Sequence, residues 1–232
     1  GTFVPGLNLT LKKGNIRGEP SNGMLCSEKE LVISDKHEGI IELPVGTKIG
    51  LPVAEILDLN DPVIEIEITP NRGDCLGVRG VARDLAASGI GILKKLNVLQ
   101  VEGEFESLIS WKIDLKENEK YLCPKIFGRS FKNLENKESP AWMKNRLLAV
   151  DQRPISSLVD ITNYIMIDLG RPLHAYDIDK IEGCHLTIKK SKIGDKFHAL
   201  NGKVYDLDND MLVISDKHGV DDLAGIMGGE RT

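Results

Sequence analysis

The sequence predicts an α+β protein of two domains, and three observations support this class. Short apolar runs between turn residues, over 3–46 and again from His185 onward, are typical of strands. Apolar residues recur at i, i+3, i+4 and i+7 from Val78 to Leu85, which predicts a helix that Gly89 ends. The length of 232 residues, with 41% hydrophobic and 28% charged residues, suits one or two globular domains.

The first half contains the predicted short strands and tight loops of a small barrel, followed by a strand-turn-helix unit. Ile64–Ile68 alternates apolar and acidic residues, which predicts a strand with one buried face. Pro70 and Asn71 end that strand, and Asp74 is suited to cap the following helix. Periodicity is weak between 90 and 110, so we expect a linker there.

The second half alternates between strand and helix signals. Strands are predicted over 111–116 and 125–131. A helix is predicted from Ser139 to about 150, with Ser139 as its N-cap and a proline at its first position. A second helix begins near 156–157 and ends before Gly170. Asn201-Gly202 predicts a hairpin turn, and Met211–Ser215 predicts a further strand.

Charge and cysteine content limit the function classes. A net charge of −5 and a pI of about 5.6 argue against a surface that grips phosphates everywhere, so any nucleic-acid contact must be local. The four cysteines form no C-x-x-C pair, which predicts reduced thiols and no metal site. No apolar run is long enough for a membrane span, so no membrane partner is expected, and the cysteine usage indicates a cytoplasmic location.

Three motifs in a fixed order carry a specific resemblance. They are Asn22–Leu31 (NGMLCSEKEL), Ile66–Gly80 (IEITPNRGDCLGVRG) and a third set comprising DITNY from Asp160, GRPLHAYD from Gly170 and LAGIMGGE from Leu223. Together they resemble the β subunit of bacterial phenylalanyl-tRNA synthetase over nearly the whole chain. Because the chain begins at Gly1, without an initiator methionine, we expect it to be cut from a longer protein. The resemblance implies that it is an N-terminal piece of that subunit.

The resemblance implies a domain plan. Residues 1–50 would form the C-terminal half of a tRNA-binding barrel of the OB type, and 51–95 the strand-turn-helix subdomain. Residues 96–110 would be the linker, and 111–232 the editing domain, cut at its C-terminus. In the family, a further segment beyond that point completes the pocket with a glutamate for the tyrosine hydroxyl, so the chain alone is expected to edit poorly.

The resemblance also implies the partners. They are tRNA(Phe) and an α subunit in an α2β2 assembly, and that α subunit would carry out ATP- and Mg²⁺-dependent charging. No cofactor is expected in this chain, because the sequence has no Gly-rich phosphate loop.

Proofreading has a chemical rationale. Tyrosine differs from phenylalanine by one hydroxyl, and an apolar pocket discriminates against such an isostere by only ~10². A second site that hydrogen-bonds the hydroxyl can select tyrosyl-tRNA for hydrolysis, because phenylalanine would leave buried polar groups unpaired. The ester at the tRNA 3′ end is activated, so positioned water suffices and no nucleophilic side chain is required.

The resemblance assigns the pocket residues, and each has a structural alternative. His174 and Thr162 match pocket positions, although His174 could be a structural histidine and Thr162 could only bond a helix carbonyl. Gly228 and Gly229 could bring backbone N–H groups close to the substrate, or form a bulge. Two further substrate-binding candidates come from the same motifs, Asn163 and Arg171, and the arginine could instead pair with Asp177.

Three functions remain at this point. The first is the synthetase β subunit, which contributes tRNA binding and hydrolysis of tyrosyl-tRNA(Phe). The second is a free-standing editing deacylase, and the third is a non-catalytic module for tRNA docking or assembly.

Overall fold

The computed structural model describes residues 1–231, which divide into two compact units, one of residues 1–62 and one that begins at Val63. The domain boundaries predicted from the sequence remain a prediction. The first unit has two antiparallel strand pairs and one short helix: β1 (Phe3–Val4) with β2 (Leu9–Thr10), β3 (Gly14–Ile16) with β4 (Glu19–Ser21), and α1 (Val53–Ile56). The two pairs are separate sheets, so the half-barrel is not confirmed.

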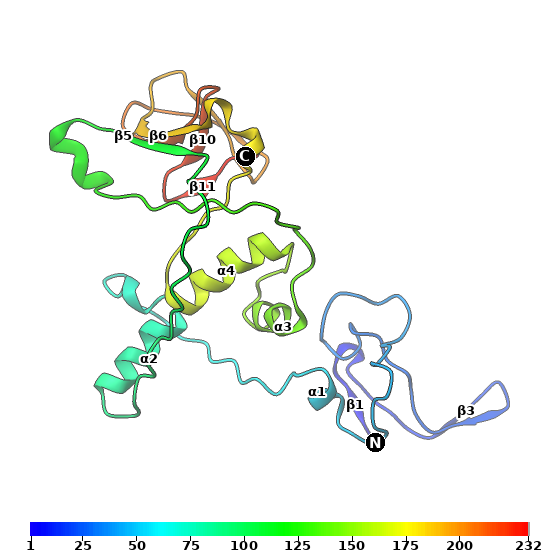
Figure 1. Ribbon diagram of the computed structural model, residues 1–232. Coiled ribbons are helices and arrows are strands. Elements are labelled where there is room, and N and C mark those ends of the chain that lie inside the picture. The colour runs from blue at the N-terminus through cyan, green and yellow to red at the C-terminus, as the bar shows by residue number, and fades with distance from the viewer. Residues whose placement is uncertain (232) are drawn as a thin grey trace. The chain divides into compact units, whose positions relative to one another are not determined.

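The second unit is built on a five-stranded sheet in the order β11-β10-β9-β6-β5 (Figure 1). Its strands are β5 (Ser110–Asp114), β6 (His185–Lys190), β9 (Leu212–Ser215), β10 (Val220–Leu223) and β11 (Met227–Gly228). β5 and β6 are parallel, and the other neighbours are antiparallel. The mixed α+β class is therefore confirmed.

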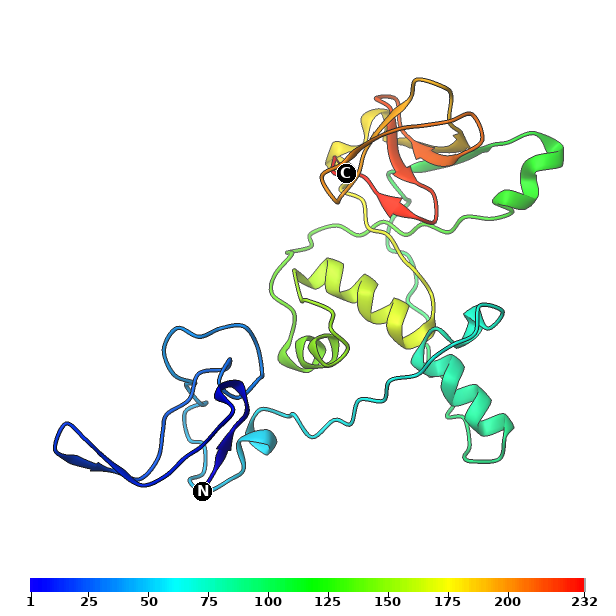
Figure 2. The ribbon, with the colours of Figure 1, turned by 180° about the vertical axis from the view of Figure 1, so that it is seen from behind.

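The predicted hairpin is confirmed beside this sheet. β7 (Lys196–His198) pairs with β8 (Val204–Asp206), and Gly202 in the turn has φ of 74°. Phe197 of β7 and Val213 of β9 are fully buried, and both belong to one apolar core. A second apolar core lies around Leu186 of β6. Figure 2 shows the same strands from behind.

Three helices belong to the same unit: α2 (Val78–Ala87), α3 (Ala141–Ala149) and α4 (Ser157–Leu169). Both α2 and α3 pack against α4. A Cβ on Gly77, just before α2, would lie 2.4 Å from the backbone nitrogen of Gly170, so the two helix ends meet where both residues lack side chains. Gly170 ends α4 with φ of 65°, a left-handed conformation that glycine adopts without strain.

Two predicted strands are wrong. Residues 64–68 and 125–131 form no strand, and Ile64 is 75% exposed. Alternation of apolar and polar residues favours a strand only where another strand lies alongside to complete the hydrogen bonds, and within 1–231 neither segment has such a partner.

Two predicted helix caps are also wrong. The side chain of Asp74 does not cap α2, because its carboxylate binds Arg72 and Arg83 instead. The N-cap of α3 is Pro140 rather than Ser139. The Ser139 hydroxyl is buried and donates to the Asp160 carboxylate on α4 at 2.5 Å. In both cases another side chain binds the residue in place of the helix backbone.

No helix among the described residues has the length and apolar character needed to cross a membrane.

Candidate functional site

His174 lies on the segment that follows α4 and packs directly on Gly228 of β11, 54 positions later in the chain. A Cβ built on Gly228 would lie 2.3 Å from Cε1 of the His174 ring and 3.1 Å from each ring nitrogen. A side chain at position 228 would force the imidazole to move. Gly228 is buried, whereas the His174 side chain keeps 30% of its surface exposed. The structure therefore brings together two of the residues predicted from the sequence, His174 and Gly228.

Two further side chains complete the surroundings of His174. The Tyr176 ring meets the imidazole edge to face, with centroids 4.5 Å apart. The Tyr176 hydroxyl donates to Oδ2 of Asp222 at 3.2 Å. The same Oδ2 lies 3.8 Å from Nε2 of His174. Neither Tyr176 nor Asp222 was predicted from the sequence.

The local backbone explains how Asp222 reaches this position. β10 has an irregular register between Val220 and Asp222, and Asp222 pairs with Ile214 of β9 and Gly228 of β11. Asp222 therefore lies on the strand beside the glycine that supports His174. Its residue surface is only 5% exposed.

Burial sets the protonation of the three groups. It raises the pKa of Asp222 to about 6, and the hydrogen bond from Tyr176 opposes this shift. Burial lowers the pKa of His174 and, together with the Asp222 charge, raises the pKa of Tyr176. At neutral pH the site thus contains a mostly ionised carboxylate, a neutral imidazole and a protonated phenol. A neutral imidazole can accept a proton from water.

Gly229 has a structural role in this arrangement. Its N–H donates to the carbonyl of Asp221 at 2.8 Å, and a Cβ there would lie 2.3 Å from that same carbonyl oxygen. The carbonyl of Gly228 accepts from Leu200 N–H at 3.1 Å. The Gly229 N–H is therefore already engaged, and the glycine allows β11 to approach β10 closely.

The remaining predicted site residues are Thr162, Asn163 and Arg171. Thr162 is half-buried on α4, and its hydroxyl donates to the carbonyl of Val159 at 2.7 Å, as a helix threonine commonly does. Within residues 1–231, no hydrogen bond or ion pair joins Thr162, Asn163 or Arg171 to His174. In the same range Arg171 has no ion pair with Asp177, which instead pairs with Lys180 at 4.0 Å.

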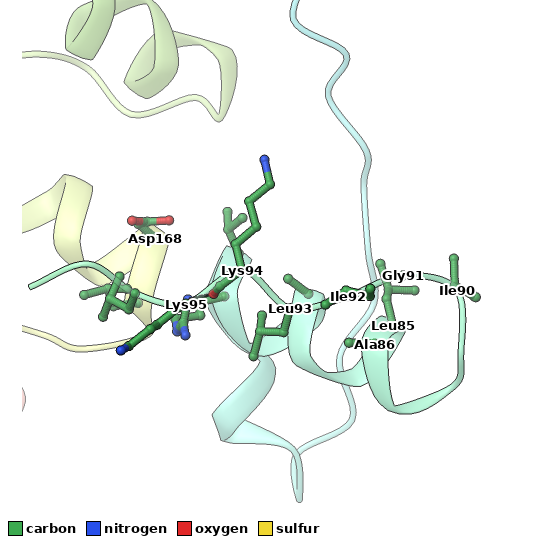
Figure 3. Close-up of a pocket in the computed structure, with 14 residues that line it drawn as sticks. Leu85, Ala86, Ile90, Gly91, Ile92, Leu93, Lys94, Lys95 and Asp168 are labelled. Carbon is green, nitrogen blue, oxygen red and sulfur yellow. Dashed lines mark hydrogen bonds between the residues drawn. The ribbon is translucent and has the colours of Figure 1, made fainter.

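Two surface depressions of the second unit are distinct from this cluster. The larger, of about 520 Å³, runs along the apolar face of α2 and the segment after it, with Asp168 at one end (Figure 3). The other, of about 460 Å³, lies beside β7 and is bordered by Lys196, His198 and Arg231. Neither is lined by His174, which sits on the surface with its ring partly exposed.

One group of potential metal ligands, Asp74, Cys75 and Asp84, brings its ligand atoms within 4.8 Å of one another. The guanidinium of Arg72 already occupies this group. It binds Asp74 at 3.0 Å, Cys75 at 2.8 Å and Asp84 at 2.6 Å, and its hydrogen bond lowers the pKa of Asp74 to about 2. An arginine in this position replaces the charge that a metal ion would bring, so the cluster fits an internal ion-pair network.

Comparison with known proteins supports one family. Residues 122–232, which include every residue of the His174 cluster, match the model of the B3/4 domain. The whole chain is 52% identical to the phenylalanine–tRNA ligase β subunit of Bartonella henselae and 49% identical to that of Bartonella quintana. It is 47% identical to the β subunit of Mesorhizobium japonicum.

The chain covers 28–29% of the length of these relatives, and each alignment extends over all of its 232 residues. An identity near one half along the entire chain, together with the B3/4 domain, establishes the relationship. The chain belongs to the family of bacterial phenylalanine–tRNA ligase β subunits.

Proposed function

We propose that this chain is the part of the ligase β subunit that binds tRNA(Phe) and hydrolyses tyrosyl-tRNA(Phe), with His174 and Gly228 in the hydrolytic site. The observation that carries the proposal is the packing of His174 on Gly228, where a Cβ would lie 2.3 Å from the imidazole. Two segments far apart in sequence meet there, and both belong to the region that matches the B3/4 domain.

The chemistry available at this place suits ester hydrolysis. The lowered pKa of His174 keeps its ring neutral at physiological pH, so the ring can take a proton from a water molecule. The 3′ ester of an aminoacyl-tRNA is reactive enough for an attack by activated water. A site that combines a neutral base with a partly exposed surface can admit both the ester and the water.

In this proposal the two subunits of the complete enzyme carry out different reactions. Charging, with its ATP and Mg²⁺, belongs to the α subunit of an α2β2 assembly in the cytoplasm. Three observations support this division: the names of the relatives, the absence of a phosphate-binding loop from the sequence, and the occupation of the acidic cluster by Arg72. Thr162, Asn163 and Arg171 remain candidates for substrate contact in this proposal.

The test is a His174→Ala substitution in the complete synthetase. Loss of a general base typically costs ~10²–10⁴ in rate, and we expect the low end because water reaches this partly exposed site. Hydrolysis of preformed tyrosyl-tRNA(Phe) should slow, whereas the rate of phenylalanine charging should not change, because charging occurs elsewhere. Hydrolysis at the wild-type rate would refute the assignment of His174.

A further inference from the structure

The Asp222 carboxylate is buried beside His174 and has no role in the hydrolysis proposed so far. Carboxylic acids seldom lie at 5% exposure without a partner, and Asp222 has two neighbours. The Tyr176 hydroxyl donates to its Oδ2 at 3.2 Å, and Nε2 of His174 is 3.8 Å from the same oxygen. One oxygen atom thus connects the phenol and the imidazole.

We propose that Asp222, held by Tyr176, is a positioning residue that orients the His174 ring and fixes which of its nitrogens carries the proton. This inference rests on the proposed function and adds two residues to its site. A carboxylate facing Nε2 favours the tautomer with the proton on Nε2, which leaves the lone pair on Nδ1. Within residues 1–231, no hydrogen-bond donor occupies Nδ1, so that lone pair is free to act on water.

The geometry constrains the ring from three sides. The Tyr176 ring contacts the imidazole in a T-shaped arrangement, and Gly228 lies so close that a Cβ there would be 2.3 Å from Cε1. Asp222 faces Nε2. The separation of 3.8 Å is longer than a direct hydrogen bond, and bonds between catalytic groups commonly tighten only when the substrate is bound.

The step that this arrangement supports is balanced. Nδ1 of His174 takes one proton from water as the water oxygen forms a bond to the ester carbonyl carbon. The bond from that carbon to the ribose oxygen then breaks, and the proton on Nδ1 passes to the ribose oxygen. The products are tyrosine and tRNA. Asp222 keeps its charge throughout and stabilises the imidazolium that exists between the two transfers.

Few other charged groups act on Asp222. On the loop that covers it, the titratable neighbours are His174 and Tyr176. Its strand neighbours in register, Ile214 on β9 and Gly228 on β11, carry no charge. Asp221, the preceding residue, pairs with Arg231. On β7, Lys196 and His198 line the separate depression near Arg231. Burial and the hydrogen bond from Tyr176 are thus the main influences on the pKa of Asp222, and burial is the main influence on that of His174.

Two substitutions test the positioning role, because they move the pH dependence in opposite directions. In Asp222→Asn the imidazolium loses its negative partner, so the pKa of His174 falls and the acid limb of the pH–rate profile moves to lower pH. In Tyr176→Phe the carboxylate loses a hydrogen-bond donor, so the pKa of Asp222 rises. Because the proposed step requires an ionised Asp222 beside a neutral His174, the acid limb then moves to higher pH. A purely structural role would not separate the two variants in this way.

The experiment measures single-turnover hydrolysis of tyrosyl-tRNA(Phe) by the complete synthetase from pH 5 to 8, with phenylalanine charging as the check on overall integrity. We expect Asp222→Asn to lower the rate constant by roughly 10- to 100-fold, since a misplacement of about 1 Å can cost ~10². Tyr176→Phe should cost less. The matched control is Asp216→Asn, which alters a buried carboxylate that binds Arg231 and should leave the acid limb in place.

His174→Ala, measured in the same experiment, distinguishes failure of the positioning role from failure of the hydrolytic site. If His174→Ala slows hydrolysis but Asp222→Asn and Tyr176→Phe keep the wild-type rate and acid limb, the positioning role is overturned and the hydrolytic site stands. The role is also overturned if both variants shift the limb in the same direction. If His174→Ala itself hydrolyses normally, the assignment of the hydrolytic site fails first.

Discussion

Replacement of Gly228 by alanine should disable hydrolysis through a displacement that the structure defines. The new methyl group would lie 2.3 Å from Cε1 of His174, whereas ordinary contacts of a Cβ begin near 3.4 Å. The ring must therefore move by about 1.1 Å, the difference between these two distances. A misplacement of about 1 Å can cost ~10² in rate, so we expect tyrosyl-tRNA(Phe) hydrolysis to fall by about that factor.

Gly228→Ala should lower the free energy of unfolding only modestly. Overpacking typically costs ~1–3 kcal/mol, and the low end applies here because the obstructing atoms belong to a side chain that is 30% exposed and can swing outward. Gly229→Ala provides the contrast, since its Cβ would meet the backbone oxygen of Asp221 at 2.3 Å and no rotamer relieves that clash. Gly229→Ala should therefore reduce stability more than Gly228→Ala does.

The assay is single-turnover hydrolysis by the complete synthetase, combined with thermal unfolding. Gly219→Ala serves as the matched control, because its Cβ would meet nothing within 4 Å. In a His174→Ala background, Gly228→Ala should have no further effect on the rate, since the group it displaces is already gone. Losses that multiply in the double variant, or a Gly228→Ala variant of normal activity, would refute the reasoning.

Three further predictions follow from the sequence and the charges. The isolated chain should show no phenylalanine-dependent pyrophosphate exchange, and exchange in a clean preparation would place charging in this subunit. With a net charge of −5, it should bind two unrelated tRNAs weakly and about equally in a filter assay, with binding lost as salt increases; tight, selective binding would contradict this. Because burial raises the pKa of Asp222 from 3.8 to about 6, its contribution to stability is present below about pH 4 and is lost as the pH rises through 6. Asp222→Asn should thus raise the free energy of unfolding at pH 8 by up to about 3 kcal/mol, as measured in urea, and should not raise it at pH 4; a loss of stability at pH 8 would contradict the sign.

Local signals in the sequence predicted those elements that local interactions determine. The apolar spacing of α2, the glycine that ends α4 at 170 and the Asn-Gly turn between β7 and β8 each act within a few residues, and each is confirmed. The failed strands over 64–68 and 125–131 depended on partners elsewhere in the chain, which alternation of side chains cannot reveal. The cap assigned to Ser139 failed in the same way. Its actual partner, Asp160, lies 21 residues away and cannot be recognised from the local sequence.

The site residues likewise include some that the sequence could identify and some that only the fold reveals. Motif resemblance located His174 and Gly228, and the structure brings them into contact. Tyr176 lies within a quoted motif, but only the fold shows that its hydroxyl reaches Asp222, 46 residues later. Asp222 lies just outside the last motif, beside another aspartate, and a pair of acidic residues in sequence is ordinarily solvated. Its burial against His174 was not predictable from the sequence because it depends on the irregular register of β10.

The most direct measurement compares the rates at which the complete wild-type synthetase hydrolyses tyrosyl-tRNA(Phe) and phenylalanyl-tRNA(Phe), each with and without His174→Ala. A site that hydrogen-bonds the extra hydroxyl should hydrolyse the tyrosyl ester faster by at least ~10², and His174→Ala should remove most of that difference. Equal wild-type rates for the two esters, or a difference that persists unchanged in His174→Ala, would contradict the account.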